Sequence, residues 1–371
     1  MGCDIRPFQR AIAEQTARFR ELSGQGKRSI GYLCTYAPVE LIHAAGFLPI
    51  RISGHDKTIQ DADSLVPVFI CPFLRRAMEA GMSGDYDFLS GIVQGYTCDA
   101  ACGLIDIWQE NVGGDVFHTV PLPYNDNPEA RSFLKAGYQE LVEKLEQAGG
   151  RVTDESLAES LNLYADIRRR VLALYQRRGK PGFPLTASEF LTVIRAGFCL
   201  PPEEYLSLLD SLLAELNDGA GDTSTGVPVL ISGSLVESST VLDALEKAGA
   251  RVVADDLCTG RRHFDPIDGT GQTAMDRLVD RYIKRVPCAS RAKAETRAAY
   301  LDHLLDESEA QAVVFLFQKF CSPHLGDYPF LKKHLDERGI SSLMVELEES
   351  GDADEGRLAT RLEGFLEILN Q

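Results

Sequence analysis

The sequence predicts an α/β protein built from two doubly wound parallel-sheet domains with a helical region between them. Short apolar segments alternate with helical stretches toward both ends of the chain, and strand patterns are nearly absent from its middle. Strands that alternate with helices indicate a parallel sheet covered by helices on both faces. We therefore expect an N-terminal α/β domain, a helical region with a linker, and a C-terminal α/β domain, over residues 1–127, 128–224 and 225–371.

The N-terminal domain contains apolar segments of strand length, separated by segments long enough for two or three helical turns. Strands are expected at 46–53, 88–94 and 116–122. Helices are expected at 38–45, 72–80 and 99–111.

The middle of the chain carries apolar residues at helical spacing with charged residues between them. Helices are expected at 133–147, 157–177, 187–196 and 203–216. Breaks between them are expected at Pro181-Gly-Phe-Pro184 and at Pro201-Pro202, because proline interrupts a helix. The stretch from Asp218 to Gly226 is a linker by composition.

After this linker the strand and helix pattern of a parallel sheet returns. Strands are expected at 227–232, 251–255, 312–317 and 342–346. A helix is expected to follow the turn at Gly233-Ser234 and to end at Lys247, and a closing helix spans 357–369. The two α/β parts therefore show the same alternation of strands and helices, although no exact internal repeat is present.

The chain has 371 residues, with 38 basic and 55 acidic side chains and a formal net charge of −17. This charge argues against nucleic acid and against an anionic membrane surface as partners, because both would repel it. No apolar run approaches the roughly 18 residues of a membrane span, and the N-terminus lacks the apolar core of a signal peptide. We therefore expect a cytoplasmic protein, in which nine cysteines do not indicate a disulfide framework.

Five cysteines lie where parallel sheets bind their ligands. Cys98, Cys258 and Cys321 each follow a predicted strand, and ligands of such sheets bind beyond the carboxyl ends of the strands. Cys34 and Cys71 lie just before helices that begin near a proline. The free N–H groups and partial positive charge of a helix N-terminus favour a thiolate.

Two interpretations of these cysteines stay open on the pattern alone. A single cysteine is more often a small buried side chain than a ligand, and we interpret Cys3 and Cys199 in that way. Zinc fits poorly, because the sequence has no CxxC pair and the one close pair is Cys98 with Cys102. Thiolates gathered from distant loops, with few histidines nearby, suit an iron–sulfur cluster better.

Three further residues are candidate proton donors near such a site: Tyr36, Glu40 and His324. Glu40 is expected in the first turn of a helix, where a carboxylate serves capping as often as catalysis. His324 follows closely after Cys321, and it is either a proton donor or a solvated loop residue.

Several segments resemble the 2-hydroxyacyl-CoA dehydratase and benzoyl-CoA reductase superfamily, which includes the 2-hydroxyglutaryl-CoA dehydratase D-component family. The segment from Tyr32 to Arg51 is similar to its first motif, and the next two motifs are matched by Cys71-Pro-Phe-Leu-Arg75 and Thr97-Cys-Asp99. Phe320-Cys-Ser-Pro323 resembles the last cysteine motif, in which many members have Cys-Asp-Pro. This chain has Ser322 at the position of that aspartate, which puts in doubt any role that the aspartate has in other members. The segment from Thr360 to Glu367 also fits.

Two more segments resemble the branch known as double-cubane cluster proteins. They run from Val252 to Arg262 and from Arg281 to Cys288. This resemblance implies a homodimer that carries a low-potential [8Fe-9S] cluster and reduces a small-molecule substrate. It also implies electron supply from a separate ATP-hydrolysing iron–sulfur activator. The chain itself has no P-loop, since the stretch from Gly269 to Thr273 lacks the required lysine.

The resemblance also implies a set of ligands. Two cubanes that share one sulfide need about three protein thiolates each. Six cysteines inside the matching motifs supply them, namely Cys34, Cys71, Cys98, Cys258, Cys288 and Cys321. Cys3, Cys102 and Cys199 are left over, and Cys102 lies one helical turn beyond Cys98. An exchange of Cys102 with one of the six stays open.

Two alternative functions also follow from the resemblance. The chain could be one half of a 2-hydroxyacyl-CoA dehydratase heterodimer that acts on an acyl-CoA thioester. It would then carry one [4Fe-4S] cluster held by three cysteines, and the motifs shared across the superfamily contain Cys71, Cys98 and Cys321. The second alternative is a non-catalytic iron–sulfur electron carrier on the same fold.

Overall fold

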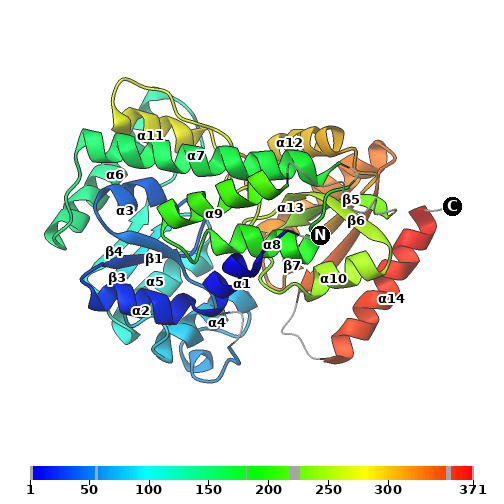
Figure 1. The fold of residues 1–371 in the computed structure, drawn as a ribbon, viewed down its shortest axis with the longest axis horizontal. Helices are drawn as coiled ribbons and strands as arrows, with labels where there is room; N and C mark the ends of the chain where they lie inside the picture. The colour runs from blue at the N-terminus through cyan, green and yellow to red at the C-terminus, as the bar shows by residue number, and fades with distance from the viewer. Residues whose placement is uncertain (1–2, 55–56, 181, 217–225, 348–351, 370–371) are drawn as a thin grey trace.

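Two four-stranded parallel sheets, with helices around them, form the framework of the molecule (Figure 1). The computed structural model describes residues 3–54, 57–180, 182–216, 226–347 and 352–369. The α/β class and the pair of parallel sheets expected from the sequence are confirmed. The linker expected from Asp218 to Gly226 lies outside the described residues, apart from its last residue.

The N-terminal sheet has the strand order β2-β1-β3-β4. The sequence predicted three of these strands, and their bounds are Leu48–Arg51 for β2, Leu89–Gly95 for β3 and Val116–Val120 for β4. It missed β1, Ser29–Tyr32, which pairs with both β2 and β3 at the centre of the sheet. This strand has four residues and includes Gly31, where a Cβ would come within 2.8 Å of the Ile52 and Leu89 side chains. So short a strand, with a glycine in it, carries a weak sequence signal.

Helices pack around this first sheet. Their bounds are Arg6–Ala13 for α1, Gln15–Gly24 for α2, Val39–Ala44 for α3, Pro72–Met82 for α4 and Asp99–Asn111 for α5, with a 3₁₀ turn η1 at Ala62–Ser64. The sequence predicted α3, α4 and α5. The helices α4 and α5 begin directly after Cys71 and Cys98, which are their N-cap residues.

Four helices make up the middle of the chain, as the sequence predicted. They are α6 (Pro128–Gln147), α7 (Asp154–Arg178), α8 (Ala187–Ala196) and α9 (Pro202–Glu215). The long helix α7 packs against α3 and α9 and also against β6 of the second sheet. In Figure 1 it runs along the molecule from the first sheet to the second. The middle helices therefore join the two sheets.

The C-terminal sheet has the order β6-β5-β7-β8, with strands at Ala250–Asp256, Val227–Gly233, Ala312–Gln318 and Ser341–Leu347 respectively. The sequence predicted all four strands and also the helices α10 (Thr240–Lys247) and α14 (Asp352–Leu369). It did not single out α11 (Ala274–Ile283), α12 (Ala294–Ser308) or α13 (Ser322–Glu337).

The helix α11 follows the C-terminal strand β6 in the chain, but it packs on α6 and α7 beside the N-terminal sheet (Figure 1). Leu278 and Tyr282 of α11 belong to the same apolar cluster as Ile30 of β1 and Val93 of β3. The chain therefore returns from the second sheet to the first before it reaches Cys288.

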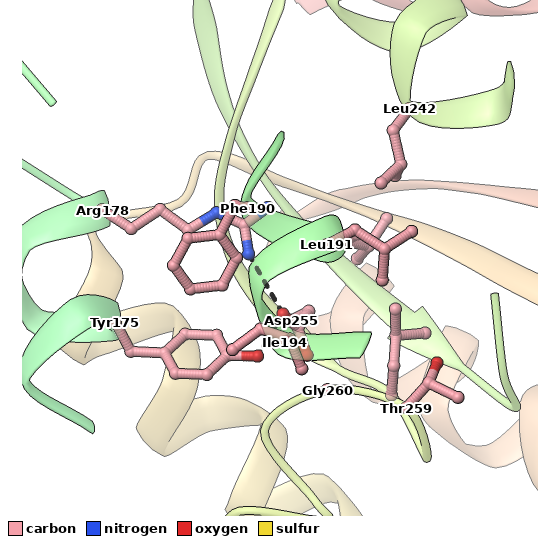
Figure 2. Close-up of a pocket in the computed structure, with 11 residues that line it drawn as sticks. Tyr175, Arg178, Phe190, Leu191, Ile194, Leu242, Asp255, Thr259 and Gly260 are labelled. Atoms are coloured by element: carbon pink, nitrogen blue, oxygen red, sulfur yellow. Dashed lines mark hydrogen bonds and ion pairs between the residues drawn. The ribbon is translucent and has the colours of Figure 1, made fainter. Parts of the chain in front are cut away.

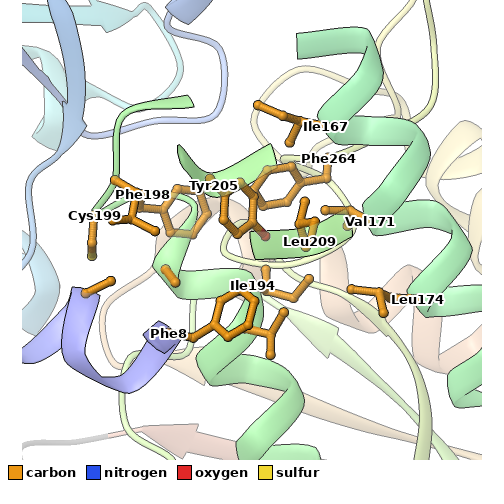
Figure 3. Packing of buried hydrophobic residues seen from close by; sticks show 14 of the residues in the cluster. Phe8, Ile167, Val171, Leu174, Ile194, Phe198, Cys199, Tyr205, Leu209 and Phe264 are labelled. Carbon is orange, nitrogen blue, oxygen red and sulfur yellow. The ribbon is translucent and has the colours of Figure 1, made fainter. Parts of the chain in front are cut away.

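One apolar core joins the chain terminus to the middle helices (Figure 3). Phe8 of α1 lies beside Ile194 of α8, and Leu209 of α9 packs with Val171 of α7 in the same cluster. Cys199 lies in this cluster and is 6% exposed. This is the environment expected of a cysteine that packs as a small apolar side chain.

Candidate functional site

The six cysteines singled out by the sequence lie at the ends of strands and helices. Cys34 follows β1 and Cys98 follows β3, and these neighbouring strands flank the point where the strand order of the first sheet reverses. Cys258 follows β6 and Cys321 follows β7 of the second sheet. Cys71 precedes α4, and Cys288 follows α11. Parallel sheets bind ligands at this edge, beside such a switch point.

Three of the cysteines begin helices. Cys71, Cys98 and Cys321 are the N-cap residues of α4, α5 and α13. Backbone N–H groups of Leu74, Ala101 and His324 respectively favour the thiolate form of each cysteine and so oppose the rise in pKa that burial causes. The start of each helix thus supplies donors to a sulfur anion.

The charges of these three cysteines also affect one another's pKa values, and we call the three residues the first triad. Burial raises the pKa of Cys98 to about 12, and the negative charge of Cys71 adds to the rise. Burial likewise raises the pKa of Cys321, with further contributions from the charges of Cys71, Cys258 and Cys98, in that order. Each member therefore lies within electrostatic reach of the other two.

Cys34, Cys258 and Cys288 form a second triad of the same kind. Burial raises the pKa of Cys258 to about 11, and the charges of Cys288 and Cys34 contribute. Burial is also the main cause that raises the pKa of Cys34, followed by the charge of Cys288. The triads adjoin each other, because the charge of Cys288 raises the pKa of Cys98 and the charge of Cys258 raises the pKa of Cys321.

The donor set fits an iron–sulfur cluster better than a single metal ion. All nine cysteines are free thiols. Within the described part of the chain, no three histidine, cysteine, aspartate or glutamate side chains are grouped as ligands of one ion. Cluster thiolates bind separate iron atoms, so they surround a volume and do not meet at a point. Six half-buried or buried thiols that come from both sheets suit that requirement.

Buried cations accompany the cysteines. The Arg262 side chain is 1% exposed and lies 3.2 Å from Asp256 Oδ1, and its charge favours the thiolate of Cys258. Arg51 donates a hydrogen bond to the Cys258 carbonyl oxygen at 3.3 Å and lies over the Phe198 ring at 5.1 Å. No ion pair joins Arg51 to a carboxylate of a described residue. Positive charge that is not fully paired suits a site for an anionic group.

Glu40 is not placed as a proton donor should be. Its carboxylate accepts hydrogen bonds from Arg168 at 2.8 Å, from Arg281 at 3.1 Å and from the Tyr282 hydroxyl at 2.8 Å. Burial by itself raises the pKa of Glu40, but the two arginines outweigh it and lower the pKa to about 2. The group is a carboxylate at neutral pH and has no proton to give. We therefore correct the expectation that Glu40 donates a proton. Its hydrogen bonds instead connect α3 to α7 and α11.

Tyr36 and His324 both lie at the cysteines. The buried Tyr36 hydroxyl has its pKa raised by desolvation and then by the charge of Cys288, so it keeps its proton at neutral pH. His324 is 4% exposed, and its Nδ1 lies 3.4 Å from Cys321 Sγ. The solvated loop position considered from the sequence is therefore wrong for His324, which lies inside α13.

Other polar residues of the site were missed by the sequence reasoning. The Thr97 hydroxyl lies 3.6 Å from Cys34 Sγ, and the Arg51 guanidinium reaches the Cys258 loop across the two parts of the chain. Thr97 directly precedes Cys98, so its place in that motif was the available signal. Arg51 is the last residue of the first motif, but its contact with Cys258 depends on tertiary packing and could not be read from the sequence.

Cys102 lies beside Cys98 of the first triad. It is on α5, one turn after Cys98, and its charge raises the pKa of Cys98. Its own pKa is raised by burial and then by Asp99 and Asp106 of the same helix. The side chain therefore faces acidic residues of α5. Cys3 packs at the edge of the apolar core shown in Figure 3.

A small pocket beside β6 is lined by no cysteine and has a volume of about 10 Å³, room for one water molecule (Figure 2). Asp255 lies in its wall, where it accepts hydrogen bonds from the Tyr175 hydroxyl at 2.7 Å and from Arg178 at 3.1 Å. The backbone N–H of Arg261 donates to the same carboxylate at 2.9 Å. This network fixes the turn that leads from β6 to Cys258.

Comparison with known proteins agrees with this arrangement. The model of the 2-hydroxyglutaryl-CoA dehydratase D-component family matches residues 34–369. The chain belongs to this family. The match begins at Cys34 and includes both triads.

Relatives within the family are components of dehydratases and of a reductase. The chain is 27% identical to the (R)-phenyllactyl-CoA dehydratase beta subunit of Clostridium sporogenes, over 94% of each chain. It is 28% identical to the beta subunit of the lactoyl-CoA dehydratase of Anaerotignum propionicum, over 93% of this chain and 92% of the relative. It is 27% identical to one of the subunits of the benzoyl-CoA reductase of Thauera aromatica, over 87% and 86% respectively. Among the described residues, no helix combines the length and the apolar character needed to cross a membrane.

Proposed function

We propose that this family member holds a double-cubane [8Fe-9S] cluster and reduces small molecules with electrons from an ATP-hydrolysing iron–sulfur activator. The observation that carries the proposal is the grouping of the six cysteines into two adjoining triads. Each cubane needs about three protein thiolates when a sulfide joins it to the other. The first triad, Cys71, Cys98 and Cys321, would hold one cubane, and the second, Cys34, Cys258 and Cys288, would hold the other.

When bound, this group supplies stored electrons at low potential. The residues of the chain perform the remaining tasks. The first turns of α4, α5 and α13 place backbone N–H groups where they favour the thiolates of the first triad. Arg262 and Arg51 offset negative charge beside Cys258. Tyr36 keeps its proton in a buried position beside Cys288 and Cys34, and it is our candidate proton donor.

A second candidate function is supported by the relatives. Two of them are beta subunits of dehydratases that act on 2-hydroxyacyl-CoA compounds, according to their names. On this alternative the first triad holds one [4Fe-4S] cluster, the enzyme requires a different second chain, and the substrate is an acyl-CoA thioester. The second triad would then have no ligand to bind, although it consists of three mutually interacting free thiols.

Iron analysis separates the two candidates. The protein is purified under anaerobic conditions, reconstituted with iron and sulfide, and assayed for both elements. About eight iron atoms per chain are expected for the double cubane and about four for a single cubane. Cys258→Ala and Cys288→Ala should each lower the iron content substantially, and Cys102→Ala, the matched control, should leave it unchanged. A wild-type protein that binds no iron overturns both candidates.

Reduction and turnover then test the activity. Addition of the activator with ATP should reduce the iron-loaded protein, observed by electron paramagnetic resonance. Dehydration of lactoyl-CoA or phenyllactyl-CoA in the presence of a different second chain would favour the dehydratase. The homodimer expected for the double-cubane branch is tested by the mass of the anaerobic protein in solution.

A further inference from the structure

His324 and Cys321 are joined through the first turn of α13. Cys321 is the N-cap residue, and His324 is three residues further on, so the imidazole lies over the start of the helix. Its Nδ1 lies 3.4 Å from Cys321 Sγ. The ring packs against Phe317 of β7, with 5.7 Å between the ring centres. The imidazole is therefore held in one place beside a sulfur of the first triad.

The other ring nitrogen faces a cation. His324 Nε2 lies 3.2 Å from one terminal nitrogen of Arg262 and 3.3 Å from the other. A guanidinium has hydrogen-bond donors and no acceptor. The Gly233 carbonyl oxygen also lies near the ring, but it accepts a hydrogen bond from the same guanidinium. We therefore assign Nε2 as the acceptor from Arg262 and the ring proton to Nδ1, directed at Cys321 Sγ. A doubly protonated ring would place two buried cations in contact.

Arg262 is itself fixed, so the tautomer that it selects is fixed as well. Its guanidinium donates a hydrogen bond to the Gly233 carbonyl oxygen and forms an ion pair with Asp256. Asp256 in turn accepts hydrogen bonds from Arg297 and from the Ser232 hydroxyl, each at 2.9 Å. Ser232, Gly233 and Asp256 come from the ends of β5 and β6, and Arg297 comes from α12, so the second sheet and its helix orient the histidine of α13.

We infer that His324 is a positioning residue that donates its Nδ1–H to the Cys321 sulfur and thereby raises the reduction potential of the cluster. The inference rests on the proposed function. A hydrogen bond to a ligand sulfur stabilises the more negative, reduced state. Both ring nitrogens are occupied, one by Cys321 and one by Arg262. The ring has no nitrogen left for a substrate, and this replaces the expectation that His324 supplies protons to the reaction.

Two substitutions at this position separate the hydrogen bond from simple packing. His324→Leu fills much of the space and removes the N–H. His324→Asn places an amide N–H where Nδ1–H stood and lacks the rest of the ring. His334→Leu is the control on the same helix, because His334 bonds to Asp302 and not to a cysteine. The midpoint potential of each iron-loaded protein is measured by redox titration with electron paramagnetic resonance, together with its iron content.

The midpoint potential of His324→Leu should be more negative than that of the wild type, and His324→Asn should return it toward the wild-type value. His334→Leu should match the wild type. If His324→Leu binds too little iron to titrate, retention of iron in His324→Asn supports the inference, and equal loss in both variants overturns it. An unchanged potential in His324→Leu at full iron content overturns the inference and leaves the proposed function standing. A wild-type protein without iron overturns the proposed function and this inference with it.

Discussion

Arg285 donates a hydrogen bond to the Thr35 hydroxyl at 2.8 Å, although 250 residues separate the two in the sequence. The same guanidinium also donates to the Thr35 carbonyl oxygen. Thr35 is next to Cys34, and Arg285 is three residues before Cys288. This contact therefore joins the two segments that bring the second triad together.

Replacement of Arg285 by methionine should destabilise the protein and weaken the second triad. Asp265, which is fully buried, pairs with Arg285 at 2.9 Å and would keep only its weaker contact with Arg281, at 3.2 Å. Breaking a buried ion pair costs about 3–5 kcal/mol in the free energy of unfolding. Urea denaturation measures the loss. The control is Arg169→Met, whose side chain is 57% exposed and which should change stability by less than about 1 kcal/mol. Equal stabilities of Arg285→Met and the wild type would contradict the role assigned to this contact.

Arg51→Met should make the reduction potential of the loaded cluster more negative. The cation lies beside Cys258 and has no carboxylate partner among the described residues, so it offsets negative charge at the site. Loss of a nearby positive charge disfavours the reduced state. Redox titration measures the shift. Arg28→Met is the matched control, because Arg28 also lies over a phenylalanine ring, that of Phe47, but not beside a cysteine. Equal shifts in both variants would refute a local effect.

The stability of the protein should depend on pH through Glu40. The pKa of this carboxyl is about 2 in the folded protein and 4.5 without perturbation. Because folding lowers the pKa, the contribution is complete above about pH 4.5 and is lost as the pH falls toward 2. Its size is on the order of 3 kcal/mol. Urea denaturation of the wild type and Glu40→Gln should show a difference at pH 6 that shrinks below pH 4.5. A difference independent of pH over this range would show that Glu40 is not the group responsible.

Exposed aromatic residues beside the first triad should affect activator docking. Phe69 is 68% exposed and lies two residues before Cys71, and Phe320 is 41% exposed and directly precedes Cys321. Exposed apolar side chains beside a site favour a protein partner. Phe69→Ser should raise the activator concentration for half-maximal reduction by about tenfold, which corresponds to about 1.4 kcal/mol. The iron content should not change. Phe133→Ser, at a residue of α6 that is 56% exposed, is the control, and an equal effect there would contradict a local docking surface.

Local periodicity in the sequence was sufficient for most of the fold. It predicted the α/β class, the strands of the second sheet, the helices of the middle region and five of the cysteines at the functional edge. Helix and strand formation depend on residues a few positions apart, so a single sequence reveals them. The strand β1 was not predicted because it has only four residues and one of them is Gly31.

The tertiary structure decided which of these residues meet. Tertiary packing places α11 beside the first sheet, so that the charge of Cys288 acts on Cys34. It also places the Arg262 guanidinium next to the His324 ring. It also changed the expected role of Glu40 by surrounding that carboxylate with Arg168 and Arg281. Such charges and hydrogen bonds act over a few ångströms in space between residues that lie far apart in the chain. The sequence determined most of the strands and helices and where the cysteines lie along them, and the packing of the two sheets determined the charge and hydrogen bonding of the site.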